Sequence, residues 1–93
     1  MNFWYEDYKN LNLLKGEIKF ILHDDEDMIE IRYKDGMLID VGYIKKDNSY
    51  YITIVSTDDE SGWNKPLDVI EIKSKKHLFD KIQETIYKYR KSR

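Results

Sequence analysis

An acidic run that follows His23 contains the residues most suggestive of chemistry. It consists of Asp24, Asp25, Glu26 and Asp27, and a hard cation can use carboxylates of this kind as ligands. The run lacks the ligand spacing and the central glycine of an EF-hand loop, and four adjacent acids cannot all face one ion. We therefore interpret it as a solvated hairpin loop whose charges discourage edge association, and we predict no metal site and no cofactor.

A second acidic run, made of Asp58, Asp59 and Glu60, stands a few residues before Trp63. In a sheet of consecutive antiparallel strands, the two acidic runs belong to loops at opposite ends. We therefore do not expect them to combine into the paired carboxylates of a hydrolase.

Trp63 falls in the longest connection of the chain, outside the strand pattern. It has two interpretations. A large aromatic residue in a loop can anchor a partner, because it buries much area at little entropy cost. Alternatively, it folds back and plugs the open end of the core. The outward row of Tyr51, Thr53 and Val55 either joins Trp63 in a shallow binding patch or forms an ordinary β-rich surface.

Neither histidine has a catalytic setting. His77 is expected in the first turn of a C-terminal helix, away from its apolar side, and His23 opens the acidic loop. The chain has no nucleophile-elbow glycine pattern, and its four glycines are each isolated, so no phosphate-binding loop is present. We predict that the protein is not an enzyme.

Positive charge is concentrated towards the C-terminus. Residues 1–72 hold 8 basic and 16 acidic residues, a net charge of −8, whereas residues 73–93 hold 8 and 2, a net charge of +6. On a helical wheel the basic side chains scatter over the whole polar side, whereas a DNA-reading helix gathers them on one face. The acidic remainder also opposes long-range attraction. Nucleic-acid binding is therefore only an alternative function, and it would use Lys88, Arg90, Lys91 and Arg93.

Apolar residues recur with period two between residues 17 and 73, which predicts four or five strands. Three connections join them into an antiparallel meander with one apolar face: a loop over residues 23–28, a three-residue loop ending at a left-handed Gly36, and a tight turn at residues 47–48. The predicted pairs are Leu22 with Ile29, Phe20 with Ile31, Tyr33 with Met37, Ile31 with Ile39, Tyr43 with Ile52, and Val41 with Ile54.

A sheet with one apolar face needs a cover. Residues 74–90 supply a long helix with Ser74 as its N-cap and an apolar stripe about 100° wide. The stripe consists of Leu78, Phe79, Ile82, Ile86 and Tyr89. Residues 4–14 could form a short second helix. The fold class is α+β, in a single domain over residues 1–93.

The composition narrows the function classes. The chain has no cysteine, which excludes a disulfide scaffold and fits a reducing compartment. No apolar run approaches the roughly 20 residues of a membrane span, and the first residues do not resemble a signal peptide, so we expect a soluble cytoplasmic protein.

We expect a non-enzymatic module that binds a protein partner of basic character; toxin neutralisation by an immunity protein is one such case, by analogy of fold alone. In this hypothesis the acids steer the partner, and Trp63 and Tyr51 anchor it. The steering residues are Asp24, Asp25, Asp27, Asp58, Asp59 and Glu60. The protein is expected to be a monomer or a weak homodimer that pairs through a sheet edge.

Overall fold

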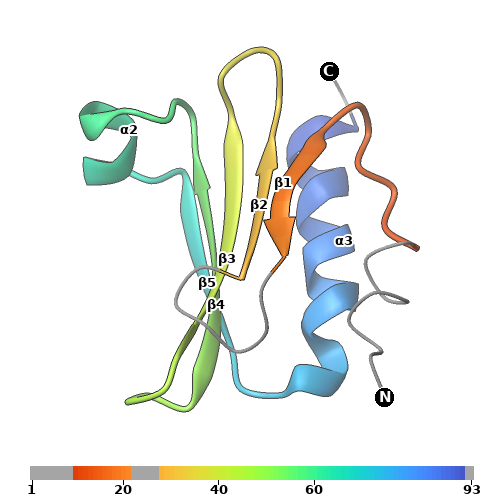
Figure 1. Cartoon of the computed structure of the whole chain (residues 1–93), viewed down its shortest axis with the longest axis vertical. Coiled ribbons are helices and arrows are strands. Elements are labelled where there is room, and N and C mark those ends of the chain that lie inside the picture. Colours follow the sequence, from red (N-terminus) through yellow and green to blue (C-terminus); the bar gives the residue numbers. More distant parts are fainter. Residues whose placement is uncertain (1–9, 22–27, 92–93) are drawn as a thin grey trace.

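The computed structural model describes residues 10–21 and 28–91, and these form a five-stranded antiparallel sheet with helices on both sides. The strands lie in sequence order across the sheet, so the predicted α+β meander is confirmed. Figure 1 shows α3 along one face of the sheet and α2 near one end of the other face. The elements are β1 (Glu17–Ile21), β2 (Ile29–Arg32), β3 (Leu38–Ile44), β4 (Ser49–Val55), α2 (Glu60–Asn64), β5 (Asp68–Ile72), the 3₁₀ turn η1 (Lys75–His77) and α3 (Leu78–Arg90).

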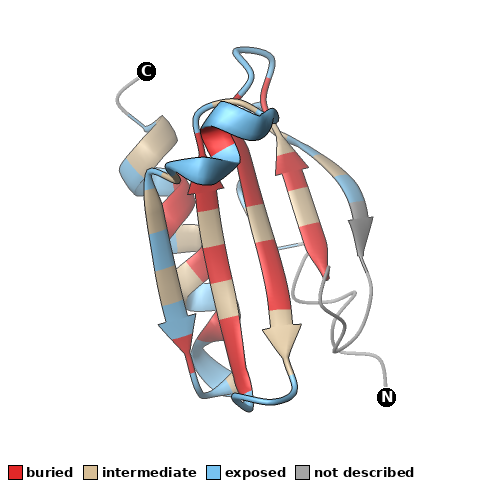
Figure 2. Ribbon diagram, turned by 90° about the vertical axis from the view of Figure 1, so that its left-hand side faces the viewer, coloured by how far each residue is buried: buried red, intermediate tan, exposed pale blue. Residues whose placement is uncertain are grey.

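The core lies between the sheet and α3. Partners across an antiparallel ladder share a face, so the alternating isoleucines and valines of neighbouring strands meet on one side. Figure 2 shows this alternation along the strands as bands of buried and partly exposed residues. Both layers contribute core side chains that have no exposed surface. They are Ile29, Ile31, Ile39, Val41, Ile52 and Ile54 in the sheet, and Leu78, Ile82 and Ile86 in the helix.

The turn between β2 and β3 has the predicted form. The Gly36 N–H donates to the Tyr33 carbonyl at 3.1 Å, and the Tyr33 N–H donates to the Met37 carbonyl at 3.0 Å. Gly36 has φ +100°, a conformation that glycine adopts without a steric penalty. Ile31 pairs with Ile39 as expected.

The predicted register between β3 and β4 is wrong by two residues. Val41 pairs with Ile52, not with Ile54, because the connection is a four-residue loop over residues 45–48. Asn48 takes φ +53° in this loop, and its side chain accepts a hydrogen bond from the Tyr43 hydroxyl at 2.7 Å. A shift of two residues keeps every side chain on the same face, so the apolar pattern alone could not reveal it.

The predicted register between β1 and β2 is also wrong. Ile18 pairs with Ile31, in place of Phe20, and Ile21 pairs with Ile29, in place of Leu22. The register is one residue off at Ile21, and a bulge between Ile18 and Phe20 adds a second residue at Ile18, since an extra residue on one strand shifts all partners beyond it. Leu22 lies outside the described residues.

The predicted helix ends at Arg90 as expected but starts differently. Ser74 takes an extended conformation without a side-chain capping bond, and its carbonyl accepts the His77 N–H at 3.1 Å. A 3₁₀ turn therefore precedes α3, and the predicted cap is not made. The N-terminal helix expected over residues 4–14 falls largely outside the described residues, and its described part, residues 10–14, is not helical.

Residues 10–16 run beside α3 (Figure 1). The Gln83 side-chain amide forms hydrogen bonds with both the backbone N–H and the backbone carbonyl of Asn12. Its oxygen accepts the Asn12 N–H at 2.6 Å, and its nitrogen donates to the Asn12 carbonyl at 3.0 Å. The Gln83 side chain thus satisfies the backbone N–H and carbonyl of Asn12, which in a sheet would bond to a neighbouring strand.

Candidate functional site

The face of the sheet opposite α3, here called the outer face, is covered only at one end by the residues that the structure describes. Leu38 and Val55 are cross-strand partners on this face, and both are buried, with 1% and 0% exposure. They lie at the end of the sheet where the chain leaves β4 for α2 (Figure 1). The sequence analysis did not predict α2. The signal was the pair Asp59 and Glu60, since an aspartate N-cap followed by an acid favours a helix start.

Leu67 and Val69 remain exposed along the uncovered part, at 47% and 51%, and Trp63 on α2 is exposed at 41%. Val69 is the cross-strand partner of Thr53, whereas its neighbour Ile70 pairs with the core residue Ile52. Val69 and Thr53 therefore belong to the outer face. We call this surface the outer patch, which consists of Tyr51, Thr53, Trp63, Leu67 and Val69.

Trp63 is held in one orientation. Its indole N–H donates to the Asp58 carboxylate at 2.9 Å, and its backbone N–H donates to the Asp59 carbonyl at 3.0 Å. Its helix lies across the sheet from α3 (Figure 1), so Trp63 does not plug the core beneath α3. A fixed and partly exposed indole is compatible with the anchor interpretation, which stays a prediction.

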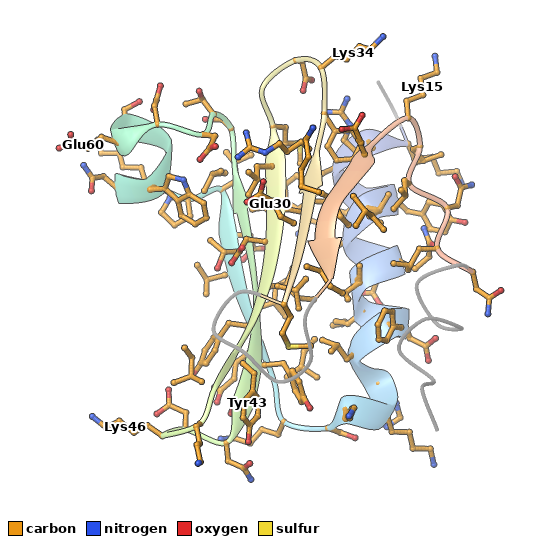
Figure 3. All side chains as sticks on the ribbon, viewed as in Figure 1. Lys15, Glu30, Lys34, Tyr43, Lys46 and Glu60 are labelled. Carbon is orange, nitrogen blue, oxygen red and sulfur yellow. The ribbon has the colours of Figure 1, made fainter. Side chains whose placement is uncertain are left out.

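The acids that precede Trp63, which are Asp58, Asp59 and Glu60, differ in their bonding partners. Asp58 also pairs with Arg32 at 2.6 Å, and the Trp63 hydrogen bond followed by Arg32 lowers the pKa of this carboxyl. Asp59 is the N-cap of α2, and bonds from the Gly62 N–H and the Ser61 hydroxyl lower its pKa. Glu60 forms no ion pair with another residue that the structure describes, and Figure 3 shows it directed away from the sheet.

Tyr51 lies on the outer face towards the opposite end of β4 from α2, so the outer patch is elongated. Its hydroxyl donates to the Asp47 carboxylate at 2.8 Å. This hydrogen bond is the main reason that the pKa of Tyr51 rises to about 12. Trp63 and Tyr51 thus share one face, with Thr53 between them along β4.

An acidic row runs beside the outer patch. Glu30 on β2 is the direct partner of Asp40 on β3, which in turn is the partner of Thr53. Like charges directly opposite each other destabilise a sheet. Arg32 bonds to Glu30 and offsets part of this repulsion. The predicted pair of Ile31 with Ile39 already implied that Glu30 lies opposite Asp40, but these two acids were not included among the predicted site residues.

The first acidic run, with Asp24, Asp25 and Asp27, lies outside the described residues, so its steering role stays a prediction. Among residues 10–21 and 28–91, no three His, Cys, Asp or Glu side chains are grouped so that they could hold a metal ion. Within the same residues, no helix has the length and apolar character needed to cross a bilayer.

The basic residues of the alternative site are placed unequally. The Arg90 side chain is only 12% exposed; its guanidinium lies 4.0 Å from the centre of the Tyr33 ring and donates to Asp35 at 2.8 Å. Lys88 lies 3.7 Å from an Asp68 oxygen. Lys91 is exposed, and Arg93 lies outside the described residues. Arg90 is therefore occupied within the fold.

The Tyr33 ring that stacks on Arg90 gives a pH-dependent prediction. Its hydroxyl donates to the Leu13 carbonyl at 2.7 Å, and burial raises its pKa to about 12. The unfolded state ionises near pH ~10. The stabilisation from Tyr33 is therefore complete below about pH 10 and is lost as the pH rises towards 12.

We expect Tyr33→Phe to be less stable than the wild type at about pH 9, by about 1 kcal/mol for the lost hydrogen bond. This difference should shrink at about pH 11, because only the wild type has a proton to lose there. Urea midpoints of both proteins at the two pH values provide the measurement. A difference that stays constant would contradict the buried neutral hydroxyl.

Comparison of the chain with protein-family models, with curated proteins and with solved structures finds no match in any of the three.

Proposed function

We propose that the protein is a non-enzymatic binding module that docks a basic protein segment on its outer patch. The observation that carries the proposal is the juxtaposition of exposed Trp63, Leu67 and Val69 with the acidic pair Glu30 and Asp40 on a largely uncovered sheet face. An absence of cysteine fits the reducing cytoplasm as its compartment.

The physical argument combines apolar anchoring with charge. Aromatic residues at the centre of an interface contribute most of the binding energy, and Trp63 needs little further ordering because its indole is already bonded to Asp58. The surrounding acids attract a cationic partner and exclude an acidic one. The partner should therefore carry lysines or arginines around one or two apolar side chains.

The test uses a designed peptide of alternating lysine and leucine and a matched peptide of alternating glutamate and leucine. We expect the basic peptide to shift the NMR signals of Thr53, Val69 and the Trp63 indole, with an affinity that falls as salt is added. The acidic peptide should have no such effect. Equal binding of both peptides, or shifts confined to α3, would refute the proposal.

A pair of variants locates the surface. Trp63→Ser should weaken binding of the basic peptide by about ten-fold or more, the ordinary loss of a central aromatic anchor. Tyr87→Ser is the matched control, because Tyr87 is 40% exposed but lies on α3. Equal losses in the two variants would indicate non-specific hydrophobic contact.

Nucleic-acid binding through the C-terminal basic residues remains the alternative proposal, with less support because Arg90 is occupied by Tyr33 and Asp35. Gel retardation with the double variant Lys88→Gln and Lys91→Gln tests it without removing the buried arginine.

Weak self-association through a sheet edge is a further proposal. On the edge strand β5, the Val69 N–H already donates a hydrogen bond to the Asp68 carboxylate at 2.9 Å, so β1 is the better candidate edge for pairing.

A further inference from the structure

The turn over Leu13–Gly16 has a backbone conformation that its residues do not favour. Leu14 has φ 51° and Lys15 has φ 77°, values at which a β-carbon is crowded. The turn is closed by a bond from the Gly16 N–H to the Leu13 carbonyl at 3.1 Å. Strained residues of this kind persist only where the surroundings hold them, and they cluster at ligand sites.

Tyr33 is what holds the turn. Its hydroxyl donates to the Leu13 carbonyl at 2.7 Å, and its ring packs so closely on Gly16 that an added β-carbon would lie 2.7 Å away. The Arg90 guanidinium lies over the same ring, at 4.0 Å from the ring centre. Turn, ring and arginine thus form one rigid unit, which fixes the backbone of Lys15 relative to Arg90.

A hollow of about 370 Å³ opens beside this unit, lined by Leu14, Lys15, Arg90 and Lys91. Its volume is within the range of small-molecule sites, about 300–1,000 Å³. Of the lining residues that the structure describes, Lys15, Arg90 and Lys91 are cationic and Leu14 is apolar. Lys15 forms no ion pair with any residue in the described ranges, and the Lys91 ammonium lies 5.4 Å from the centre of the Tyr87 ring.

Arg90 supplies a second observation. One of its terminal nitrogens, Nη1, bonds to Asp35 at 2.8 Å, but its Nε is buried and has no acceptor among the described residues. A buried N–H without a partner is costly, and in native proteins it calls for an acceptor. Arg90 therefore lines the hollow, whereas its unpartnered Nε–H is itself buried and not exposed to that space.

More positive charge surrounds the same end of the molecule. A smaller hollow of about 220 Å³ shares Lys15 and is also lined by Lys19, Arg32 and Lys34, with Glu17 bonded to Lys19. Figure 3 shows Lys15 and Lys34 projecting from one end of the molecule and Lys46 from the other. Lys19 and Arg32 are paired with acids, whereas Lys15 and Lys34 form no ion pair with any described residue. A bound anion would relieve the repulsion between these two lysines.

We propose that the hollow between Lys15, Arg90 and Lys91 binds a small phosphate-bearing ligand. A phosphoryl group carries up to two negative charges and accepts hydrogen bonds from several directions, which suits the ammonium groups of Lys15 and Lys91 in this lining. The charge of Arg90 is already paired with Asp35, so the two lysines supply the attraction. The site differs from the outer patch, and it does not depend on the proposed function.

The test titrates inorganic phosphate, pyrophosphate and adenosine monophosphate into the protein at constant ionic strength, with sodium chloride as the compensating salt. We expect saturable NMR shifts of the amides of Lys15, Gly16 and Lys91 and of the Arg90 Nε–H. The three arms distinguish a free phosphate from a phosphoryl group carried by a nucleoside, and saturation with any of them supports the proposal. Shifts that rise without saturation in all three would overturn it.

Two matched variants complete the design. Lys15→Gln should weaken binding of the tightest probe by about ten-fold, the ordinary effect of losing one charge-assisted hydrogen bond. Lys46→Gln removes the same charge at the far end and should leave the affinity unchanged. Thermal melting of both variants verifies the fold. Equal weakening in the two variants would show a general charge effect and refute the site.

Discussion

Replacing Gly62 with alanine is expected to lift α2 from the sheet and to destabilise the protein by about 1–3 kcal/mol, the usual range for overpacking. An alanine Cβ at this position would lie 2.0 Å from the Thr57 carbonyl oxygen and 3.0 Å from the Thr57 methyl carbon. The first contact is with backbone, so no side-chain rotation can relieve it. Alanine would gain about 1 kcal/mol over glycine in an ordinary helix, and the clash exceeds this gain.

The consequence extends beyond α2. Leu38 and Val55 are buried at the end of the outer face where α2 lies, and a displaced α2 would expose them. The measurements are the urea midpoint and the NMR signal of the Trp63 indole N–H, which should lose its bond to Asp58. Glu60→Ala is the control, because Glu60 is exposed on the same helix. An unchanged indole signal in the Gly62→Ala protein would contradict the close packing described for α2.

Truncating Ile82 to alanine should have the largest effect on stability. Ile82 has no exposed surface and lies on α3 in the cluster that faces the sheet isoleucines. Removing a buried isoleucine side chain costs about 2–5 kcal/mol, because the transfer energy is lost and a cavity remains. A domain of this size has a total stability of only about 5–15 kcal/mol, so much of it would disappear.

The control for this prediction is Glu84→Ala on the same helix. Glu84 is exposed, and its only side-chain contact among the described residues is the surface ion pair with Lys81 at 3.0 Å. The change should cost less than about 1 kcal/mol. Thermal unfolding separates the two, since each 1 kcal/mol corresponds to about 4–8 °C in a small domain. Similar melting temperatures for both variants would mean that α3 does not cover the core.

The fold was predictable to the extent that the alternation of inward and outward side chains along the strands determines it. Alternation assigned Ile31, Ile39 and Ile52 to one face, and Gly36 identified the turn that joins β2 to β3. The alternation of inward and outward side chains is unchanged when a strand shifts by two residues, which explains the error in the predicted register between β3 and β4. It also cannot reveal an extra residue within a strand, which explains the error at the bulge in β1.

The site was less predictable, because a sequence shows charges without their partners. Asp58 and Asp59 read as free acids, yet they bind Trp63 and cap α2. Arg90 falls on the polar side of a helical wheel, yet its long stem reaches the Tyr33 ring and its charge meets Asp35. By contrast, Trp63 stood out from sequence alone, since a large aromatic residue outside the strand pattern is conspicuous wherever it packs.

The position of α3 after every strand affects how the molecule is made. The whole sheet is synthesised before the helix that shields it. At the usual ~5–20 residues per second, residues 73–90 follow over about one to four seconds. During that interval the isoleucines of the nascent chain have no cover, so they are available to chaperones or to a neighbouring nascent chain. We therefore expect the nascent chain to be most prone to aggregation in the interval before α3 packs on the sheet.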